Sequence, residues 1–126
     1  MGYAESVQQE LRGPAKELRR AIPAVYAGYA QLHDAAFAPG ALDGKAKELI
    51  ALAVAVGKQC DGCIVSHARG AARRGATTAE VAEALGVAIT LSGGPGTVYG
   101  ARAFAAFQEF TEASAEMDGS SEHHHG

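Results

Sequence analysis

The chain has 126 residues, of which 48% are apolar and 20% charged, and its 11 basic and 14 acidic residues leave a net charge of −3. This length suits one domain with a substantial core and is short for two. The slightly acidic balance gives no electrostatic reason to expect a nucleic acid or a membrane surface as a partner. Alanine dominates the apolar residues and tryptophan is absent, which favours closely packed helices and a core completed by oligomerisation.

The beginning of the chain, Met1 to Glu10, lacks the basic segment and apolar run of a secretory signal peptide. No apolar run approaches the roughly 18 residues of a membrane span. We therefore predict a cytoplasmic protein that makes no membrane contact. In a reducing compartment two cysteines are expected to be catalytic or metal-binding rather than structural.

The first third of the chain predicts one or two helices. Residues 1–13 are polar and suggest a short helix at most, while Pro14 suits the first position of a new helix. We therefore predict a polar N-terminal segment followed by a single domain at residues 14–116. Apolar residues at three- and four-residue steps predict a helix over 15–37, with a kink or break at Pro23.

The next helix is predicted to begin at Asp43, a suitable N-cap, and to contain the apolar run 49–56. Periodicity alone would also allow a buried strand here. The alanines and the lead-in Lys45-Ala46-Lys47-Glu48 favour a helix. Because this helix is apolar all round, we expect it to be buried all round, with other subunits as one source of cover.

Three signals organise the second half of the chain. A helix from about Cys60 to Arg74 ends at Gly75, which is a typical C-cap residue. Thr77 and Glu80 have the spacing of a capping box and predict the start of another helix. The glycine-rich break at 92–96 predicts a turn, because it lacks the lysine and the spacing of a phosphate-binding loop.

The last helix is predicted over about 97–115, and residues 117–126 form a polar tail. This tail carries His123-His124-His125, which are either native or the remnant of a purification tag. The predicted fold and function do not depend on them.

Both cysteines of the chain lie in the motif Cys60-Asp61-Gly62-Cys63, and His67 follows four residues later. On an α-helix the side chains of Cys60, Cys63 and His67 share an arc of about 60°. Two thiols on one face can form a disulfide, and an imidazole one turn beyond Cys63 can take the proton of its thiol. A helix N-terminus also favours a thiolate.

This motif leaves several chemistries open. Haem attachment is excluded, because Ile64 stands where a histidine would follow the second cysteine. Zinc could be bound by Cys60, Cys63 and His67 with Glu48 or a water as fourth ligand, although structural sites usually have two ligand pairs. An inert buried cysteine pair is a further alternative. We favour a redox pair, in which one thiolate attacks an oxidant, the other thiol closes a disulfide, and an external dithiol restores both.

Taken together, these residues resemble a known family. Glu48, eleven intervening residues and Cys60-x-x-Cys63-x-x-x-His67 are similar to the alkylhydroperoxidase D-like branch of the carboxymuconolactone decarboxylase superfamily. The downstream Gly75-Ala76 and Gly93-Gly94-Pro95 agree, so that the likeness covers roughly residues 40–110. The resemblance implies an all-α fold of about five to six helices that assembles as a homotrimer or homohexamer.

The resemblance also implies a thiol peroxidase that uses no cofactor. Cys63 matches the attacking cysteine, Cys60 the resolving thiol, and Glu48 and His67 a proton relay that deprotonates Cys63. The implied partners are a hydroperoxide substrate and a dithiol reductant, typically a lipoyl group on another protein. One departure is Gly62, because the peroxidase pattern often has a second relay histidine at that position. The decarboxylase branch typically lacks the cysteine pair, so lactone decarboxylation is not expected.

Two other classes of function remain as alternatives. The cysteine pair could belong to a redox sensor or to a disulfide reductase whose substrate is not a peroxide. It could also belong to an oligomeric metal-binding module with a Cys₂His ligand set.

Overall fold

The computed structural model describes residues 2–125, with side chains described up to residue 116. These residues form six α-helices and no strand, which confirms the predicted fold class: α1 (Tyr3–Ala21), α2 (Pro23–Phe37), α3 (Gly44–Gly57), α4 (Asp61–Arg73), α5 (Thr78–Ser92) and α6 (Gly94–His125). No helix in the described part of the chain is long and apolar enough to cross a membrane.

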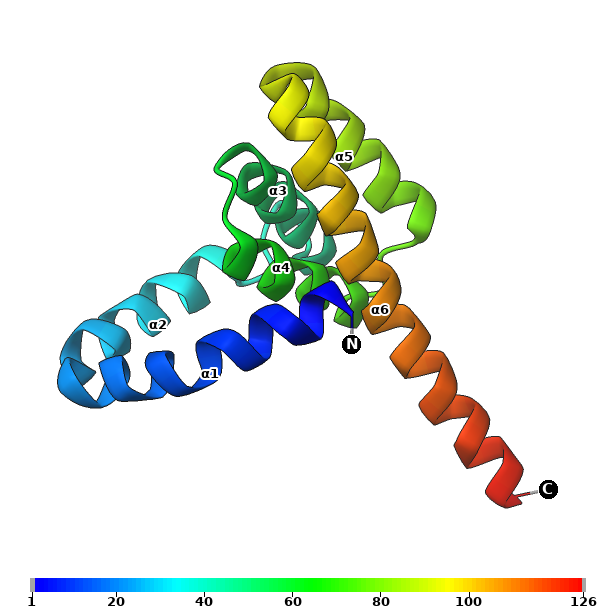
Figure 1. Ribbon diagram of the computed structural model, residues 1–126, viewed down its shortest axis with the longest axis horizontal. Helices are drawn as coiled ribbons and strands as arrows, with labels where there is room; N and C mark the ends of the chain where they lie inside the picture. The colour runs from blue at the N-terminus through cyan, green and yellow to red at the C-terminus, as the bar shows by residue number, and fades with distance from the viewer. Residues whose placement is uncertain (1, 126) are drawn as a thin grey trace.

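The helices α3, α4, α5 and α6 pack against one another, and α1 and α2 form an antiparallel arm that projects from this group (Figure 1). The beginning of α1 lies against α4 and α6. The backbone of helix α2, in contrast, lies close only to α1 and α3 within the described chain, and α2 reaches α4 through an aromatic side chain at its end. The arm therefore adds little to the core of the single chain, and α4 occupies the middle of the molecule.

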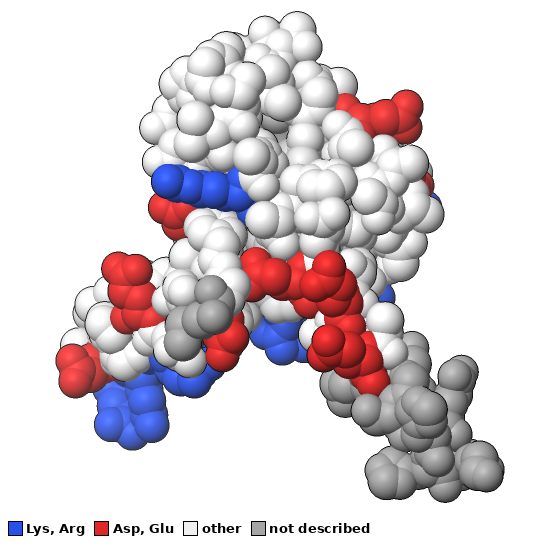
Figure 2. Space-filling view, turned by 45° about the vertical axis from the view of Figure 1, so that its right-hand side comes forward, with Lys and Arg blue, Asp and Glu red and all other residues white. Residues whose placement is uncertain are grey.

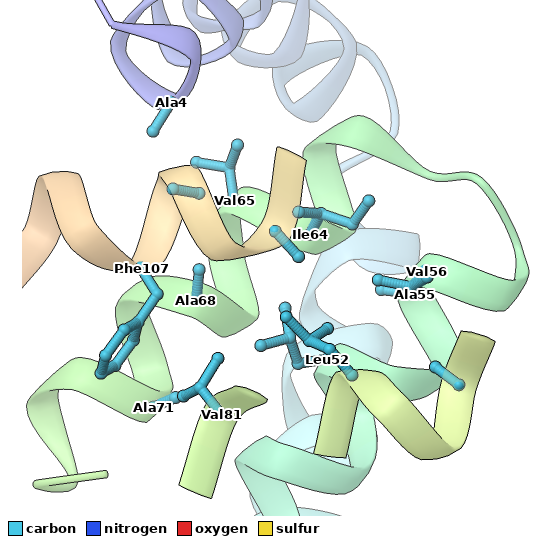
Figure 3. Packing of buried hydrophobic residues seen from close by; sticks show 14 of the residues in the cluster. Ala4, Leu52, Ala55, Val56, Ile64, Val65, Ala68, Ala71, Val81 and Phe107 are labelled. Carbon is cyan, nitrogen blue, oxygen red and sulfur yellow. The ribbon is translucent and has the colours of Figure 1, made fainter. Parts of the chain in front are cut away.

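The core lies where α3 to α6 meet and is built from small and medium-sized apolar side chains (Figure 3). Its largest fully buried side chains are Phe107, Leu52, Ile64, Val56 and Val81. Five alanines are also fully buried, namely Ala4 on α1, Ala68 and Ala71 on α4, and Ala103 and Ala106 on α6. Because these side chains are small, the helix backbones can approach closely, and this holds α4 against its neighbours.

Local signals in the sequence set several helix ends. The Asp43 carboxylate accepts a hydrogen bond from the Ala46 backbone N–H at 2.8 Å and caps α3, as predicted. Thr77 and Glu80 form the predicted capping box at the start of α5. Pro23 is the first residue of α2, which confirms the predicted break.

The predicted interruption at Gly13-Pro14 is wrong, because α1 runs without a break from Tyr3 to Ala21 with Pro14 inside it. A proline in a helix leaves the carbonyl four residues earlier without its intrahelical partner. In α1 that carbonyl belongs to Glu10, in an exposed stretch of the arm where solvent can hydrogen-bond to it.

The ends of α6 also differ from the prediction. A single residue with positive φ, Gly93 at 67°, makes the turn before α6. The helix therefore begins at Gly94 instead of near residue 97. The helix then continues beyond residue 115 to His125, through the segment predicted to be a polar tail. The side chains of His123-His124-His125 lie outside the described residues.

Helix α3 is buried on one side of the single chain only. Leu52 and Val56 are fully buried, whereas Ile50 is 51% and Val54 is 53% exposed. The prediction that this helix is buried all round is therefore wrong for one chain. Cover by other subunits remains a prediction.

Candidate active site

The two cysteines lie at the N-terminus of α4 and are joined by a disulfide, with their Cα atoms 5.2 Å apart. Cys60 is the N-cap of the helix, and its Sγ accepts a hydrogen bond from the Cys63 backbone N–H at 3.2 Å. Gln59 turns the chain into this helix with a positive φ of 55°. The pair therefore sits where unpaired backbone N–H groups favour a negative sulfur.

Glu48 and His67 approach each other from different helices. The Oε2 atom of Glu48 on α3 lies 2.9 Å from Nδ1 of His67 on α4, and their side chains are only 11% and 17% exposed. The close packing of α3 on α4 thus brings the two predicted relay residues into direct contact, across 19 positions in the sequence. His67 also stands one helical turn beyond Cys63.

Gly70 makes room for this contact and was not singled out from the sequence. A Cβ atom at position 70 would overlap the carboxylate of Glu48. A glycine in the interior of a helix costs roughly 0.5–1 kcal/mol relative to alanine. A glycine in the interior of a predicted helix, three positions after His67, is the sequence signal that could have identified Gly70.

Both cysteines and His67 line one pocket with a volume of about 590 Å³ between α2, α3 and α4. Its remaining walls are mostly apolar and comprise Ala36, Phe37, Ile50, Ala51, Val54 and Ala55, together with Lys47 and Lys58. The ring of Phe37 stacks on that of His67, with centroids 5.4 Å apart and ring planes 7° from parallel. Within this pocket Cys63 is exposed and Cys60 is half-buried.

Asp61, which lies between the two cysteines in the sequence, contacts residues of both α1 and α6. Its carboxylate accepts a hydrogen bond from the Tyr3 hydroxyl at 2.7 Å and lies 3.5 Å from the Arg102 guanidinium. Burial, and then the hydrogen bond to Asp61, raise the pKa of Tyr3 above its ordinary value, so the hydroxyl keeps its proton and remains a donor. The contact with Arg102 also balances a negative charge next to the cysteines.

Gly62 faces away from the pocket that contains His67. A Cβ atom at position 62 would lie 3.2 Å from Cδ1 of Leu11 on α1, and Gly62 lines a different cavity. A larger residue here would press on α1. In this chain, position 62 therefore serves the packing of the arm against α4.

The four predicted site residues thus converge in space: Cys60 and Cys63 are bonded, Glu48 contacts His67, and His67 shares the pocket of the cysteines. The described residues contain no group of three or more His, Cys, Asp or Glu side chains placed to hold a metal ion. What sequence reasoning missed is Phe37, Gly70 and the Tyr3–Asp61–Arg102 link.

Fold and site together define an all-α protein with a CxxC disulfide beside a buried Glu–His pair. The profile of the carboxymuconolactone decarboxylase family matches residues 23–112. This match extends over more than half of the chain, and the protein belongs to the carboxymuconolactone decarboxylase family.

Two other proteins are similar to this chain over most of its length. An uncharacterized protein of Cupriavidus necator is 41% identical over 90 residues, which cover 71% of this chain and 80% of that protein. Uncharacterized protein 4 in the cox locus of Paracoccus denitrificans is 38% identical over 97 residues, which cover 77% of this chain and 87% of that protein.

Two solved structures have the same fold. A carboxymuconolactone decarboxylase family protein of Legionella pneumophila, solved in its apo form, is 40% identical with a TM-score of 0.81, and the match covers 86% of this chain and 96% of that one. A family member from Thermotoga maritima, for which a role in an antioxidative response has been suggested, is 31% identical with a TM-score of 0.68. That match covers 72% of this chain and 94% of the Thermotoga chain.

Proposed function

We propose that the protein is a thiol peroxidase that reduces organic hydroperoxides with Cys63 as the attacking thiolate and Cys60 as the resolving thiol. The observation that carries this proposal is the contact of Glu48 with His67, which lines the pocket that contains both cysteines. An inert cysteine pair would need no buried carboxylate on the neighbouring imidazole. The antioxidative role suggested for the Thermotoga relative points in the same direction.

The reaction begins with the reduced pair. His67 takes the proton of the Cys63 thiol, while Glu48 orients the ring and balances its positive charge. The thiolate attacks one peroxide oxygen, the O–O bond breaks, and the alkoxide leaves as an alcohol with the proton held by His67. Cys63 is then a sulfenic acid.

The second half of the reaction closes the disulfide. The Cys60 thiol attacks the sulfur of Cys63, the S–O bond breaks, and the hydroxyl leaves as water with the Cys60 proton. In sum, one hydroperoxide and two thiols yield an alcohol, water and a disulfide. The oxidised pair, with Cα atoms 5.2 Å apart, is the product of this step.

The protein partners of this cycle are part of the proposal. A dithiol reductant, such as a lipoyl group carried by another protein, would attack the exposed Cys63 first and then leave as its own disulfide. The apolar pocket walls favour an alkyl-bearing hydroperoxide over hydrogen peroxide. A homotrimer or homohexamer in the cytoplasm is the proposed form of the protein.

The test is consumption of an organic hydroperoxide in the presence of a lipoyl-type dithiol, compared among wild type, Cys63→Ser and Cys60→Ser. We expect Cys63→Ser to abolish even the first turnover. Cys60→Ser, reduced and then freed of dithiol, should consume about one equivalent and then stop as a sulfenic acid that a dimedone adduct reveals by mass spectrometry. This variant is the matched control, because it removes the other half of the same disulfide.

Two outcomes contradict the proposal. Turnover by Cys63→Ser equal to that of wild type would remove the assigned nucleophile. No turnover by reduced wild type would instead favour a redox sensor or a disulfide reductase with another substrate.

A further inference from the structure

A second cavity, which we call the arginine groove, lies between α1, α4 and α6 and has a volume of about 830 Å³. Its cationic lining consists of Arg12 and Arg19 from α1 and Arg69 and Arg73 from α4. Figure 2 shows basic side chains gathered under the arm and beside α6. The groove shares no lining residue with the pocket of the cysteines, so it is a separate site on the chain.

The charge of this groove is unbalanced. Among the residues whose side chains the structure describes, no aspartate or glutamate lines the groove, and none of the four guanidinium groups lies within 4.0 Å of a carboxylate. Other cations of the chain do have such partners, as Arg102 has in Asp61 and Lys45 in Glu80. Arginine stays charged at any physiological pH. All four arginines are exposed, so water screens their mutual repulsion in part, and an anion between them would relieve the remainder.

A favourable interaction with a helix dipole explains the positions of only two of these four arginines. Arg19 and Arg73 are in the last turns of α1 and α4, where a cation interacts favourably with the helix C-terminus. Arg12 and Arg69 lie further from these ends and gain little from the dipole. Their position on facing walls of one cavity is therefore the feature that needs an explanation.

The rest of the lining indicates what kind of anion fits. Leu11, Val65 and Phe110 contribute apolar surface, and Ser66, Ser114 and Gln8 contribute hydroxyl and amide groups. The volume falls within the range of small-molecule sites. A planar guanidinium binds phosphate through two parallel hydrogen bonds. The lining thus suits a molecule with charged phosphates at one end and an apolar or aromatic body at the other.

We propose that the arginine groove binds a phosphorylated small molecule of the nucleoside diphosphate class. The phosphates lie between the arginines of α1 and α4, and the body lies on Leu11, Val65 and Phe110. Because Gly62 also lines the groove, the bound molecule contacts the back of the turn between the two cysteines. It occupies this site whether or not the pocket on the other side of that turn is filled.

The test is isothermal titration of the full-length chain with ADP at low ionic strength, together with Arg69→Gln, Arg12→Gln and Arg20→Gln. We expect saturable binding of one ADP per chain, weakened about tenfold or more in Arg69→Gln and Arg12→Gln through loss of charge-assisted hydrogen bonds. Arg20→Gln is the matched control, because Arg20 is adjacent to Arg19 and does not line the groove. Pyrophosphate, which lacks the body, should bind more weakly than ADP.

Four outcomes would overturn the proposal. These are no binding at millimolar ADP, equal affinity for pyrophosphate and ADP, an equal loss in Arg20→Gln, and a changed oligomeric state in Arg69→Gln. The last would show that the groove is instead covered by a second copy of the chain. Cys63→Ser should bind ADP as wild type does, so failure of the proposed peroxidase chemistry leaves this test intact.

Discussion

Glu48 is the one charged side chain that the described chain buries, and its surroundings explain how a carboxylate is kept there. It lies against Nδ1 of His67 and occupies the space over Gly70 that a methyl group would fill. A buried carboxylate without such a partner would be strongly destabilising. At the scale of single residues, Gly70 therefore supports the proposed relay without taking part in the chemistry.

Replacing Gly70 by alanine should displace Glu48 from His67 and lower kcat/KM for hydroperoxide by about 10- to 100-fold, the usual effect of losing a partner that orients a reactive group. The measurement is hydroperoxide turnover, accompanied by urea unfolding. Gly86→Ala in α5 is the matched control, because nothing lies within 4 Å of a Cβ atom there. It should keep full activity and gain up to about 1 kcal/mol of stability. Wild-type activity in Gly70→Ala would show that the Glu48–His67 contact is dispensable.

At the scale of helices, the beginning of α1 is attached to α4 and α6 by polar contacts. The Glu109 carboxylate on α6 accepts hydrogen bonds from the Ala4 backbone N–H, at 3.2 and 3.0 Å to its two oxygens. Such a carboxylate satisfies an otherwise unpaired N–H at a helix start and suits the positive end of the helix dipole. Together with the Tyr3–Asp61 hydrogen bond, this holds the arm next to the cysteines.

Tyr3→Phe removes the hydroxyl that donates to Asp61 and should lower the free energy of unfolding by about 1 kcal/mol. Because folding raises the pKa of Tyr3, its contribution is fully present below the ordinary tyrosine pKa of 10.0 and is lost as the pH rises further. Urea unfolding between pH 7 and pH 11 measures both effects. The difference between wild type and Tyr3→Phe should shrink above pH 10.

Tyr26→Phe is the control for this prediction, because its hydroxyl has no hydrogen bond among the described residues and phenylalanine keeps the ring over which the Arg19 guanidinium lies. It should leave stability unchanged. A difference between wild type and Tyr3→Phe that stays constant over the whole pH range would contradict the account of the Tyr3–Asp61 bond.

At the scale of the whole molecule, the exposed apolar surface of α2 is the main unexplained feature of a single chain. None of its residues is buried, and Val25, Tyr29 and Leu32 are each more than 60% exposed. The upper part of the face in Figure 2, where α5 and the beginning of α6 lie, also carries few charges. Apolar surface of this kind marks contact sites between proteins, and it supports the proposed homo-oligomer.

The double variant Val25→Glu, Leu32→Glu should therefore dissociate the oligomer, because each carboxylate would be buried without a partner at the interface. Size-exclusion chromatography with light scattering measures the mass of the particle. Gln31→Glu is the control, since it adds a charge to α2 at an exposed polar position and should leave the mass unchanged. A wild-type chain that is monomeric at micromolar concentration would contradict this prediction.

The sequence by itself determined the features that depend on neighbours along the chain. The helix starts at Asp43 and Thr77, the break at Pro23, and the placement of His67 one turn after Cys63 all follow from local propensity and helical periodicity. The family resemblance added Glu48 as a partner of His67. The break predicted at Pro14 is wrong, because α1 continues through it. The rule that proline interrupts a helix considers only neighbouring residues, and it does not take into account that the affected carbonyl remains exposed to solvent.

Only the tertiary structure decided which distant residues meet. The approach of Glu48 to His67, the space over Gly70, and the reach of Tyr3 to Asp61 depend on how closely α1, α3 and α4 pack. The same is true of the arginine groove, whose walls come from separate helices. Periodicity assigns a face to each helix but does not say which faces meet, because that choice depends on the packing of the whole core.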